Sequence, residues 1–291
     1  MSAGIVNALT QRDLYRSNRA RLKLPTLAAP AIDAYEKRWI GHCLDALPAT
    51  GATLTLAQLQ QRIGALIEEE LAAPQEAAVY VADAMPRQAF RILVQEFAVD
   101  GLTEAQAFYF ILPRLSLAAQ MPMLRIMIDE FGCGNPKRAH TSLYVNLLEE
   151  LQMPTDLAYY TERVGPACLE FVNLFYWLTL RADDPSYFAG ALTYLETSIP
   201  SFFGCYTAAC SRLGIQAHAY YSEHRHIDAF HAVEGQRLLR AMDETCTLDP
   251  GKAWRGAQLA SQIVGRAFEE AVATARLVRP VQLGEDGQRC A

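Results

Sequence analysis

Three residues of metal-binding type lie on one face of a predicted helix near the C-terminal end of the chain. The run Tyr220-Tyr-Ser-Glu-His-Arg-His-Ile-Asp-Ala-Phe-His231 contains the pattern His224-x-x-x-Asp228-x-x-His231. At about 100° per residue, offsets of four and seven return to within about 40° of the first direction, so the three side chains leave one side of the helix. Two imidazoles and one carboxylate suit iron or manganese, whereas structural zinc sites more often use thiolates. This stripe predicts a metal-binding face.

Two further candidate ligands flank a predicted reversal of the chain. Glu130 ends one helical segment, and His140 follows it by ten residues. Gly132 and Gly134 are expected to end the first helix, and Asn135-Pro136 to begin the next as its N-cap and first turn. Such a reversal can bring Glu130 and His140 to one centre. Taken alone, the segment favours a surface acid at Glu130 and a hydrogen-bonded core histidine at His140.

A third candidate segment carries a glutamate on an apolar helical face. Glu196 lies in the mainly apolar stretch 185–200, and Leu192 and Ala189 precede it by four and seven residues on the same face. An ionised carboxylate on a buried face is costly unless it is paired or bound to a metal. Glu196 is therefore a candidate ligand, with a buried salt bridge to an arginine as the alternative.

Helices are expected to position all of these side chains, because apolar residues recur at spacings of three and four almost throughout. Strand-like alternation and internal repeats are absent from the sequence. The pattern predicts an all-α fold of about eight to ten helices. Turn-forming residues divide them at 48–51, Asp100-Gly101, 132–136, Pro154, 183–185, Gly214 and 249–251.

We expect three parts along the chain. Residues 1–75 form a helical extension for packing or dimerisation, residues 76–281 form the metal-binding domain, and residues 282–291 form a flexible polar tail. A homodimer is expected. The acidic run Glu68-Glu69-Glu70 is interpreted as a solvated helix face.

Composition excludes several classes of protein. With 291 residues, 51% of them hydrophobic, the chain can bury a sizeable core. A net charge of -6 and the lack of basic runs argue against nucleic acid as a partner. No signal peptide and no apolar run of membrane-spanning length occur, so we expect a cytoplasmic protein without membrane association. The seven cysteines include no Cys-x-x-Cys pair, which is typical of a reduced intracellular chain.

Together these segments resemble the heme-oxygenase-like diiron oxidases and oxygenases, a family of iron-containing redox enzymes. The matching pieces are Asp-Glu130-x-Gly-x-Gly-Asn-Pro with His140 ten residues after the glutamate, Glu196 in the following helix, and His224-x-x-x-Asp228-x-x-His231. The resemblance spans roughly residues 85–275. It implies a heme-oxygenase-like bundle of about seven core helices that holds two Fe(II)/Fe(III) ions and uses O2 as co-substrate.

The family also takes one glutamate from its first core helix. Glu104 has suitable spacing before Glu130, with Glu96 and Asp100 as rivals. However, Thr103-x-x-Gln106 also fits a capping box, which would place Glu104 in the first turn of a helix, where a carboxylate favours the dipole. The resemblance thus implies a ligand set of Glu104, Glu130, His140, Glu196, His224, Asp228 and His231.

The extra carboxylate Glu130 resembles the N-oxygenase branch of this family. That branch implies a monooxygenase acting on a small-molecule amine or amino-acid-derived substrate in natural-product biosynthesis. Oxidative C–C cleavage, decarboxylation or desaturation of an amino acid or fatty acid is the enzymatic alternative, and a non-iron helical cofactor-binding or interaction protein is the alternative of another class. No Gly-x-Gly-x-x-Gly occurs, so electrons are expected from an external donor or reductase.

The substrate pocket is hard to locate from sequence. Arg125 and Arg138 lie near candidate ligands and are candidates for holding a substrate carboxylate. Phe171, Phe175, Tyr176 and Trp177 are interpreted as core residues rather than as a substrate cage.

Overall fold

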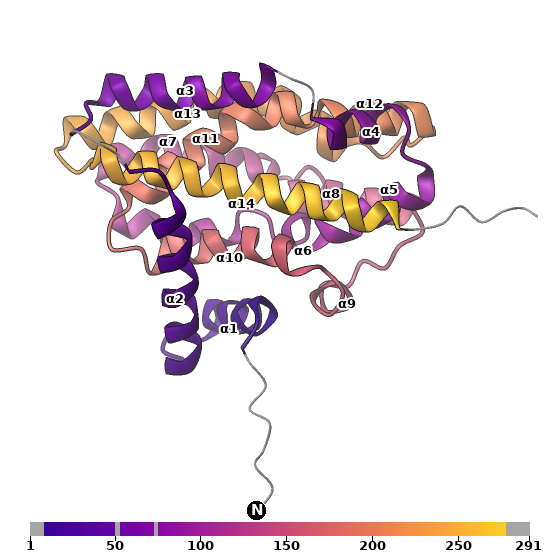
Figure 1. Cartoon of the computed structure of the whole chain (residues 1–291), viewed down its shortest axis with the longest axis horizontal. Coiled ribbons are helices and arrows are strands. Elements are labelled where there is room, and N and C mark those ends of the chain that lie inside the picture. Colours follow the sequence, from indigo (N-terminus) through magenta and orange to yellow (C-terminus); the bar gives the residue numbers. More distant parts are fainter. Residues whose placement is uncertain (1–8, 50–52, 73–74, 278–291) are drawn as a thin grey trace, which may run out of the picture.

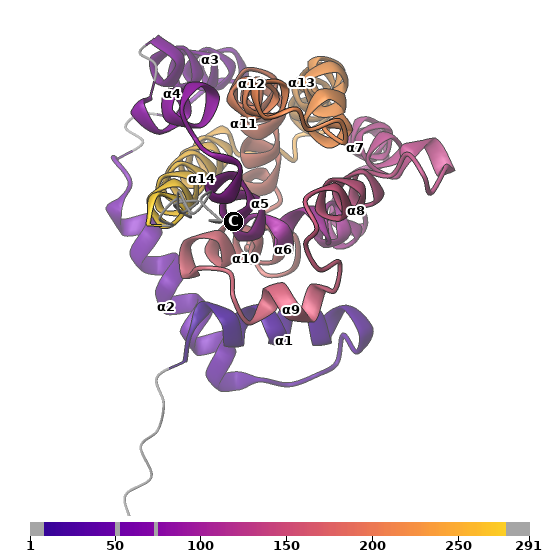
Figure 2. The ribbon, with the colours of Figure 1, turned by 90° about the vertical axis from the view of Figure 1, so that its right-hand side faces the viewer.

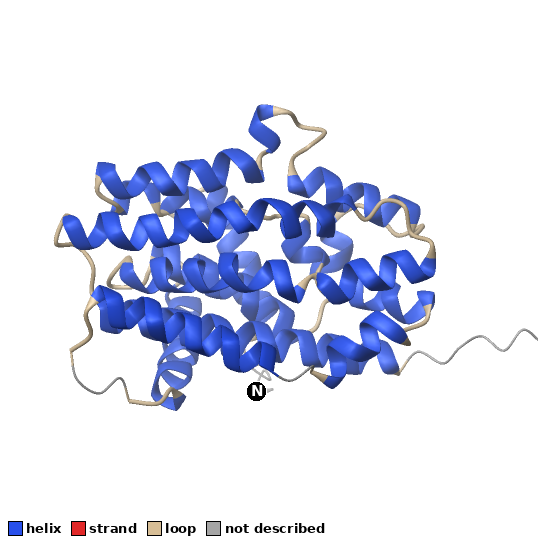
Figure 3. Cartoon of the chain, turned by 90° about the horizontal axis from the view of Figure 1, so that it is seen from above, coloured by secondary structure: helices blue, strands red, loops and turns tan. Residues whose placement is uncertain are grey.

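The computed structural model describes residues 9–49, 53–72 and 75–277, and within these ranges the chain is helical and contains no strand (Figure 3). This confirms the predicted all-α class, although fourteen α-helices exceed the eight to ten expected. The predicted tail at 282–291 lies outside the described residues. The α-helices are α1 (Gln11–Lys23), α2 (Pro30–Ala46), α3 (Leu56–Ala72), α4 (Glu76–Asp83), α5 (Arg87–Glu96), α6 (Ala98–Gly101), α7 (Leu117–Glu130), α8 (His140–Glu150), α9 (Leu157–Thr161), α10 (Pro166–Leu180), α11 (Ser186–Phe202), α12 (Gly204–Leu213), α13 (Ala219–Glu244) and α14 (Pro250–Arg276). Short 3₁₀ helices are η1 (Gln106–Phe110), η2 (Leu112–Arg114) and η3 (Gly132–Gly134).

The long helices form a bundle around α11. This helix packs on α13 and on α14, while α13 also packs on α7 and α14 on α10. Figure 1 shows α13 and α14 along the long axis of the molecule and α2 lying across it. In Figure 2 the bundle is seen end-on, with α7 and α8 beside α13. Every residue of α11 from Ser186 to Glu196 is buried, so side chains of α7, α8, α11 and α13 can meet in the interior.

Several helix boundaries occur where turn-forming residues predict them. The side chain of Asp249 caps α14 by accepting a hydrogen bond from the Lys252 backbone N–H at 3.0 Å, and Pro250 occupies the first helical position. Gly214 ends α12 with a φ of 65°, a conformation that glycine adopts without steric cost. Residues 183–185 separate α10 from α11 as expected.

Two glycines allow α11 and α14 to approach closely. A Cβ atom added to Gly190 of α11 would lie 1.8 Å from the carbonyl oxygen of Ala253, and one added to Gly256 of α14 would lie 1.9 Å from that of Tyr187. Both neighbours are backbone atoms, which cannot move without separating the helices. The position of α11, and with it that of Glu196, therefore depends on these glycines.

Replacing Gly190 by Ala is expected to lower the free energy of unfolding by about 2 kcal/mol or more, because the added methyl group overpacks a backbone contact. Gly265→Ala is the matched control on α14, since no atom lies within 4 Å of its Cβ position. That change removes a helical glycine and should stabilise the chain by up to about 1 kcal/mol. Urea denaturation of both variants measures the difference. Equal effects would contradict the close contact.

Buried polar groups attach the N-terminal helices α1 and α2 to α10. Asn18 of α1 donates to the Asn173 side-chain oxygen at 3.0 Å, and its own side-chain oxygen accepts from Arg181 at 2.7 Å. Arg181 also pairs with Glu36 of α2. Since Asn18, Glu36 and Asn173 are buried, loss of one partner would leave another polar group unsatisfied. The two helices therefore pack against the bundle through specific pairs.

The segment after α6 departs from the predicted capping box. Thr103 Oγ1 donates to the carbonyl oxygen of Val99 at 2.7 Å, so the hydroxyl belongs to the preceding turn. Ala105 then adopts a φ of 58°, in the left-handed region, and the chain continues as η1 rather than as an α-helix. The capping-box prediction was wrong for this reason. Glu104 lies in a turn between α6 and η1, not in the first turn of a helix.

The reversal after α7 is sharp, as its glycines predict. Gly132 and Gly134 have φ values of 63° and 82°, and a Cβ atom on Gly132 would lie 2.5 Å from the Arg138 backbone carbon. The predicted N-cap at Asn135 was wrong, because its side-chain oxygen accepts from the Lys137 backbone N–H at 3.1 Å in a local turn. Helix α8 begins only at His140.

Of the acidic run on α3, Glu68 and Glu69 are exposed, as predicted. Glu70 is half-buried and accepts hydrogen bonds from Tyr194 Oη at 2.7 Å and from Ser261 Oγ, so its assignment to a solvated face was wrong. Within the described ranges, no helix combines the length and the apolar character required to cross a membrane.

Candidate metal centre

Seven predicted side chains come from five separate parts of the fold. Helix α13 carries His224, Asp228 and His231, all of them buried, while α11 carries buried Glu196. The other three come from the turn after α6, from the last residue of α7 and from the first residue of α8, and they are Glu104, Glu130 and His140. The three buried residues of α13 confirm that the stripe faces inwards.

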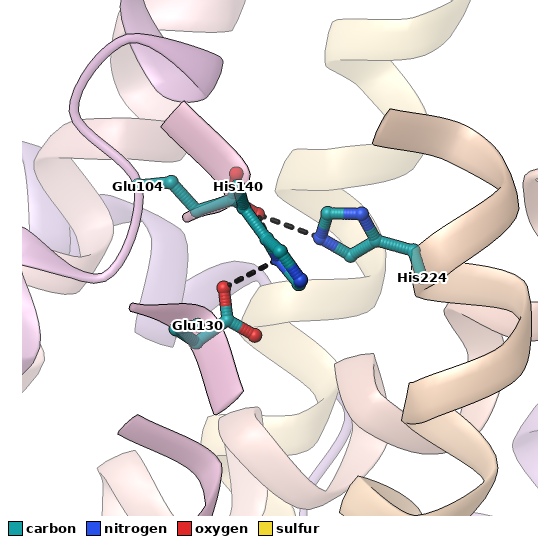
Figure 4. A group of neighbouring side chains, drawn as sticks. All are labelled: Glu104, Glu130, His140 and His224. Carbon is teal, nitrogen blue, oxygen red and sulfur yellow. Dashed lines mark hydrogen bonds and ion pairs between the residues drawn. The ribbon is translucent and has the colours of Figure 1, made fainter. Parts of the chain in front are cut away.

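Four of these side chains form a first group, which Figure 4 shows. Their candidate ligand atoms all lie within 4.8 Å of one another. His140 Nδ1 is 2.8 Å from Glu130 Oε2, and His224 Nε2 is 2.8 Å from Glu104 Oε1. The centroids of the two imidazole rings are 4.2 Å apart. Two carboxylates and two imidazoles therefore surround one point.

A second group shares one member with the first. Glu130, Glu196 and His231 offer ligand atoms that again lie within 4.8 Å of one another. His231 Nδ1 is 3.2 Å from Glu196 Oε2 and 3.6 Å from Glu130 Oε1. Asp228 Oδ1 lies 3.3 Å from the same nitrogen. Because its two oxygens face different groups, Glu130 could bridge two metal ions.

Several oxygens of the centre have no hydrogen-bond donor among the described residues. Both carboxylate oxygens of Asp228 and Oε2 of Glu104 are buried and lack such a partner. Burying anionic oxygens without donors or counter-charge is costly. Cations held between carboxylates and imidazoles would compensate this cost, and the mixed nitrogen and oxygen donor set is one that iron binds well. The residues present thus fit a pair of iron ions.

Contacts outside the centre fix the orientation of two imidazoles. His224 Nδ1 lies 2.7 Å from the carbonyl oxygen of Tyr220 and must donate to it, so Nε2 is the nitrogen that faces Glu104 and would offer its lone pair to a metal ion once deprotonated. His231 Nε2 lies 3.5 Å from Asp129 Oδ2, an ion-pair separation without a formed hydrogen bond, and Nδ1 is the nitrogen that faces the centre. Such partners set the tautomer of a metal-binding histidine.

We expect Asp129→Asn to weaken the binding of the iron ion at His231 by roughly tenfold or more, because the imidazole loses the carboxylate that orients it. Cys133→Ser is the control, since Cys133 Sγ contacts the other Asp129 oxygen at 3.3 Å and serine keeps a donor there. Anaerobic Fe(II) titration of both variants measures the affinity. Unchanged affinity in Asp129→Asn would show that the contact has no orienting role.

Charge pairing dominates the electrostatics of the centre. Burial lowers the pKa of His140 and of His231, but the facing carboxylates outweigh it and raise both to about 11. The pKa of His224 is raised to about 9 by Glu104, although burial lowers it. Burial opposes ionisation of Glu104, yet His224 and His140 bring its pKa down to about 2. Burial raises the pKa of Glu196 to about 7. Without metal, the centre holds imidazolium and carboxylate pairs.

The two rivals of Glu104 lie outside both groups. Glu96 accepts a hydrogen bond from the Gly165 backbone N–H at 2.7 Å, at the start of α10. Asp100 is near the centre but contributes to neither group. Among the histidines that the sequence did not favour, His226 is exposed, and His218 Nδ1 contacts Ser222 Oγ at 2.6 Å.

The arginines considered as substrate anchors are engaged elsewhere. Arg125 pairs with Glu234 at 3.0 Å, and Arg138 pairs with Glu223 at 3.3 Å. Neither lines the cavity beside the centre. The expectation that either arginine holds a substrate carboxylate is therefore not supported.

A cavity of about 120 Å³ adjoins the centre and includes Glu104, Glu130 and Glu196 in its lining. Its walls are mostly apolar. Of the aromatic residues interpreted from sequence as core, Phe171, Phe175 and Tyr176 line the cavity, whereas Trp177 packs on Tyr187. Sequence periodicity could not find this cavity, because core residues and cavity walls are equally apolar. Aromatic residues in the lining include Phe97, Phe108, Phe171, Phe175, Tyr176 and Phe203.

Known proteins are similar to the part of the chain that contains this centre. The family profile described as iron-containing redox enzyme matches residues 91–265, which include all seven side chains. Nitrosourea synthase from Streptomyces achromogenes subsp. streptozoticus is 28% identical over 148 residues, which are 50% of this chain and 31% of that protein. The chain thus spans about a third of the length of this relative.

Proposed function

This chain belongs to the iron-containing redox enzymes, and we propose that it is a non-heme diiron oxygenase that transfers oxygen to the nitrogen of a small-molecule amine. The observation that carries the proposal is the sharing of Glu130 by two groups of candidate ligands. We assign one iron ion to Glu104, His140 and His224, and the other to Glu196, Asp228 and His231, with Glu130 between them.

When bound, the iron pair supplies the electrons that activate dioxygen, cycling between Fe(II) and Fe(III) with an external donor or reductase to restore it. The protein's own contribution is geometric and electrostatic. Four carboxylates offset the four positive charges of two Fe(II) ions, so the loaded centre is close to neutral. The apolar cavity keeps water from the centre and holds the substrate beside the two ligand groups.

Two observations support nitrogen as the atom oxidised. The relative's name, nitrosourea synthase, denotes a product with a nitrosated nitrogen, and its similarity covers half of this chain. In addition, Glu130, the extra carboxylate by which the sequence resembles the N-oxygenase branch, lies in both candidate ligand groups. A non-iron cofactor protein is not supported by the family match.

Aerobic reaction of the iron-loaded protein with a panel of amines and a reductant tests the proposal. Mass spectrometry with isotopically labelled dioxygen should show label in a hydroxylamine, nitroso or nitro product. Fragmented, decarboxylated or desaturated products alone would instead favour the C–C cleavage alternative.

Paired variants on α13 test the ligand assignment. His224→Ala should lose iron and activity, whereas His226→Ala, two residues away and exposed, should keep both. Full iron content in both His224→Ala and Asp228→Ala would refute the assignment.

A further inference from the structure

The charged groups that line the cavity are nearly all acidic. The lining contains Asp100 in addition to the candidate ligands Glu104, Glu130, Glu196, His224 and Asp228. No lysine or arginine among the described residues lines it. Arg19 reaches the outer side of one wall, where its guanidinium bonds to Gln106 and lies 3.5 Å from Tyr176 Oη.

Asp100 is the carboxylate that the metal centre does not use. It lies on α6, and no hydrogen bond or ion pair to its carboxylate occurs among the described residues, although it is half-buried. Burial, followed by the negative charge of Glu104, raises its pKa well above the usual range. Both effects oppose an anion at this position, and a cation in the cavity would relieve them.

The net charge of the iron-loaded centre also favours a cation in the cavity. Two Fe(II) ions carry four positive charges, and Glu104, Glu130, Glu196 and Asp228 carry four negative charges, which sum to zero. Asp100, which is ionised when a cation lies beside it, then adds one negative charge to a cavity without basic side chains. A bound molecule with one positive charge completes the balance, whereas a carboxylate would add a further negative charge that no basic side chain of the lining offsets.

The remaining walls indicate the rest of that molecule. Rings of Phe108 and Phe175 lie 5.4 Å apart, and Phe171 and Phe175 are 5.8 Å apart, both in edge or tilted contact. Such walls bind apolar groups and favour a cation over their faces. These phenyl rings offer no hydrogen-bonding group to a polar part of the molecule.

We propose that the substrate is a lipophilic amine without a free carboxylate, which binds as an ammonium ion held by Asp100 and the aromatic wall. Asp100 then accepts the ammonium proton, which frees the nitrogen lone pair for oxygenation. An amino-acid-derived substrate would therefore arrive decarboxylated or with its carboxyl group masked. This inference rests on the proposed function, whose substrate class it narrows.

Binding of a matched series to the Fe(II)-loaded protein without oxygen tests the inference. Isothermal titration should show phenethylamine binding at least about tenfold more tightly than phenethyl alcohol, and phenylacetate more weakly than the alcohol. Asp100→Asn should abolish the advantage of the amine and leave alcohol binding and iron content unchanged. Asp100→Glu should restore part of it, and Glu149→Gln, which removes an exposed carboxylate on α8, should have no effect.

Tighter binding of phenylacetate, or an unchanged advantage of phenethylamine in Asp100→Asn, would overturn the inference. So would loss of iron from that variant, which would make Asp100 a ligand. The proposed function fails separately: amine binding through Asp100 without an N-oxygenated product would refute N-oxygenation alone. An N-oxygenated amine with the same KM in wild type and Asp100→Asn would refute only the role of Asp100.

Discussion

Glu130→Ala is expected to lower the iron content from about two ions per chain to less than about half an ion, because this carboxylate belongs to both candidate ligand groups. Its Oε2 lies near His140 in one group, and its Oε1 lies near His231 in the other. Glu104→Ala and Glu196→Ala each remove a ligand from one group only. They should retain roughly one ion per chain.

The number of iron ions bound per chain distinguishes the loss of a shared ligand from misfolding of the variant. Glu130→Gln keeps the shape of the side chain and removes its charge, so a correctly folded variant should still bind less iron than Glu196→Gln does. Glu149→Gln, an exposed change of the same kind, serves as the control. Elemental analysis after anaerobic loading measures iron per chain. If Glu130→Ala retained one ion, Glu130 would be an ordinary ligand of a single metal.

The fold class and the inward-facing stripe were predictable from sequence because both follow from helical periodicity. Offsets of four and seven place His224, Asp228 and His231 on one face whatever the partner helices are, and all three are buried. Glu196 was predictable for a related reason, since a carboxylate among apolar residues on one helical face has to find a partner inside.

The conformation around Glu104 was not predictable in the same way. A capping box and the observed turn use the same residue types, and the choice depends on whether Thr103 Oγ1 bonds forward to an amide or back to the Val99 carbonyl. Likewise, Asn135-Pro136 suits both a helix start and the local turn that the structure shows. Tertiary contacts decide the conformation at both positions, and these contacts cannot be inferred from the spacing of residues in the sequence.

The cavity illustrates a second limit of sequence reasoning. Phe171, Phe175 and Trp177 lie on the same helix and have the same apolar character, yet only the first two line the cavity. Which aromatic faces a void depends on the packing of α11 and η1 around α10. Asp100 was noticed in the sequence only as a rival ligand, and its position on the cavity wall requires the fold.

Iron binding by the apoprotein is expected to release at least about three protons per chain near neutral pH, three from imidazolium ions and a fraction of one from Glu196, whose pKa is raised to about 7. Only neutral imidazoles bind metals, and without metal the pKa values of His140, His231 and His224 are about 11, about 11 and about 9. The product of the two Fe(II) binding constants should therefore rise by roughly a thousandfold per pH unit between about pH 7 and pH 8, because about three protons leave when both ions bind. Titrations in buffers of different ionisation enthalpy count the protons, and His226→Ala should not change the number. Release of less than about one proton would contradict charged imidazoles.

The same shifts predict an alkaline loss of stability that iron prevents. A histidine pKa raised above its unfolded value of about 6.5 stabilises the folded apoprotein fully below that pH, and this stability is lost as the pH rises through the folded pKa. For His224 the loss begins above about pH 6.5 and is complete above about pH 9, and for His140 and His231 it continues to about pH 11. Thermal unfolding of the apoprotein should therefore show a Tm that falls from about pH 8 to pH 10. Iron-loaded protein already holds neutral imidazoles, so its Tm should not show this fall, and a parallel decline in both forms would assign the effect to groups outside the centre.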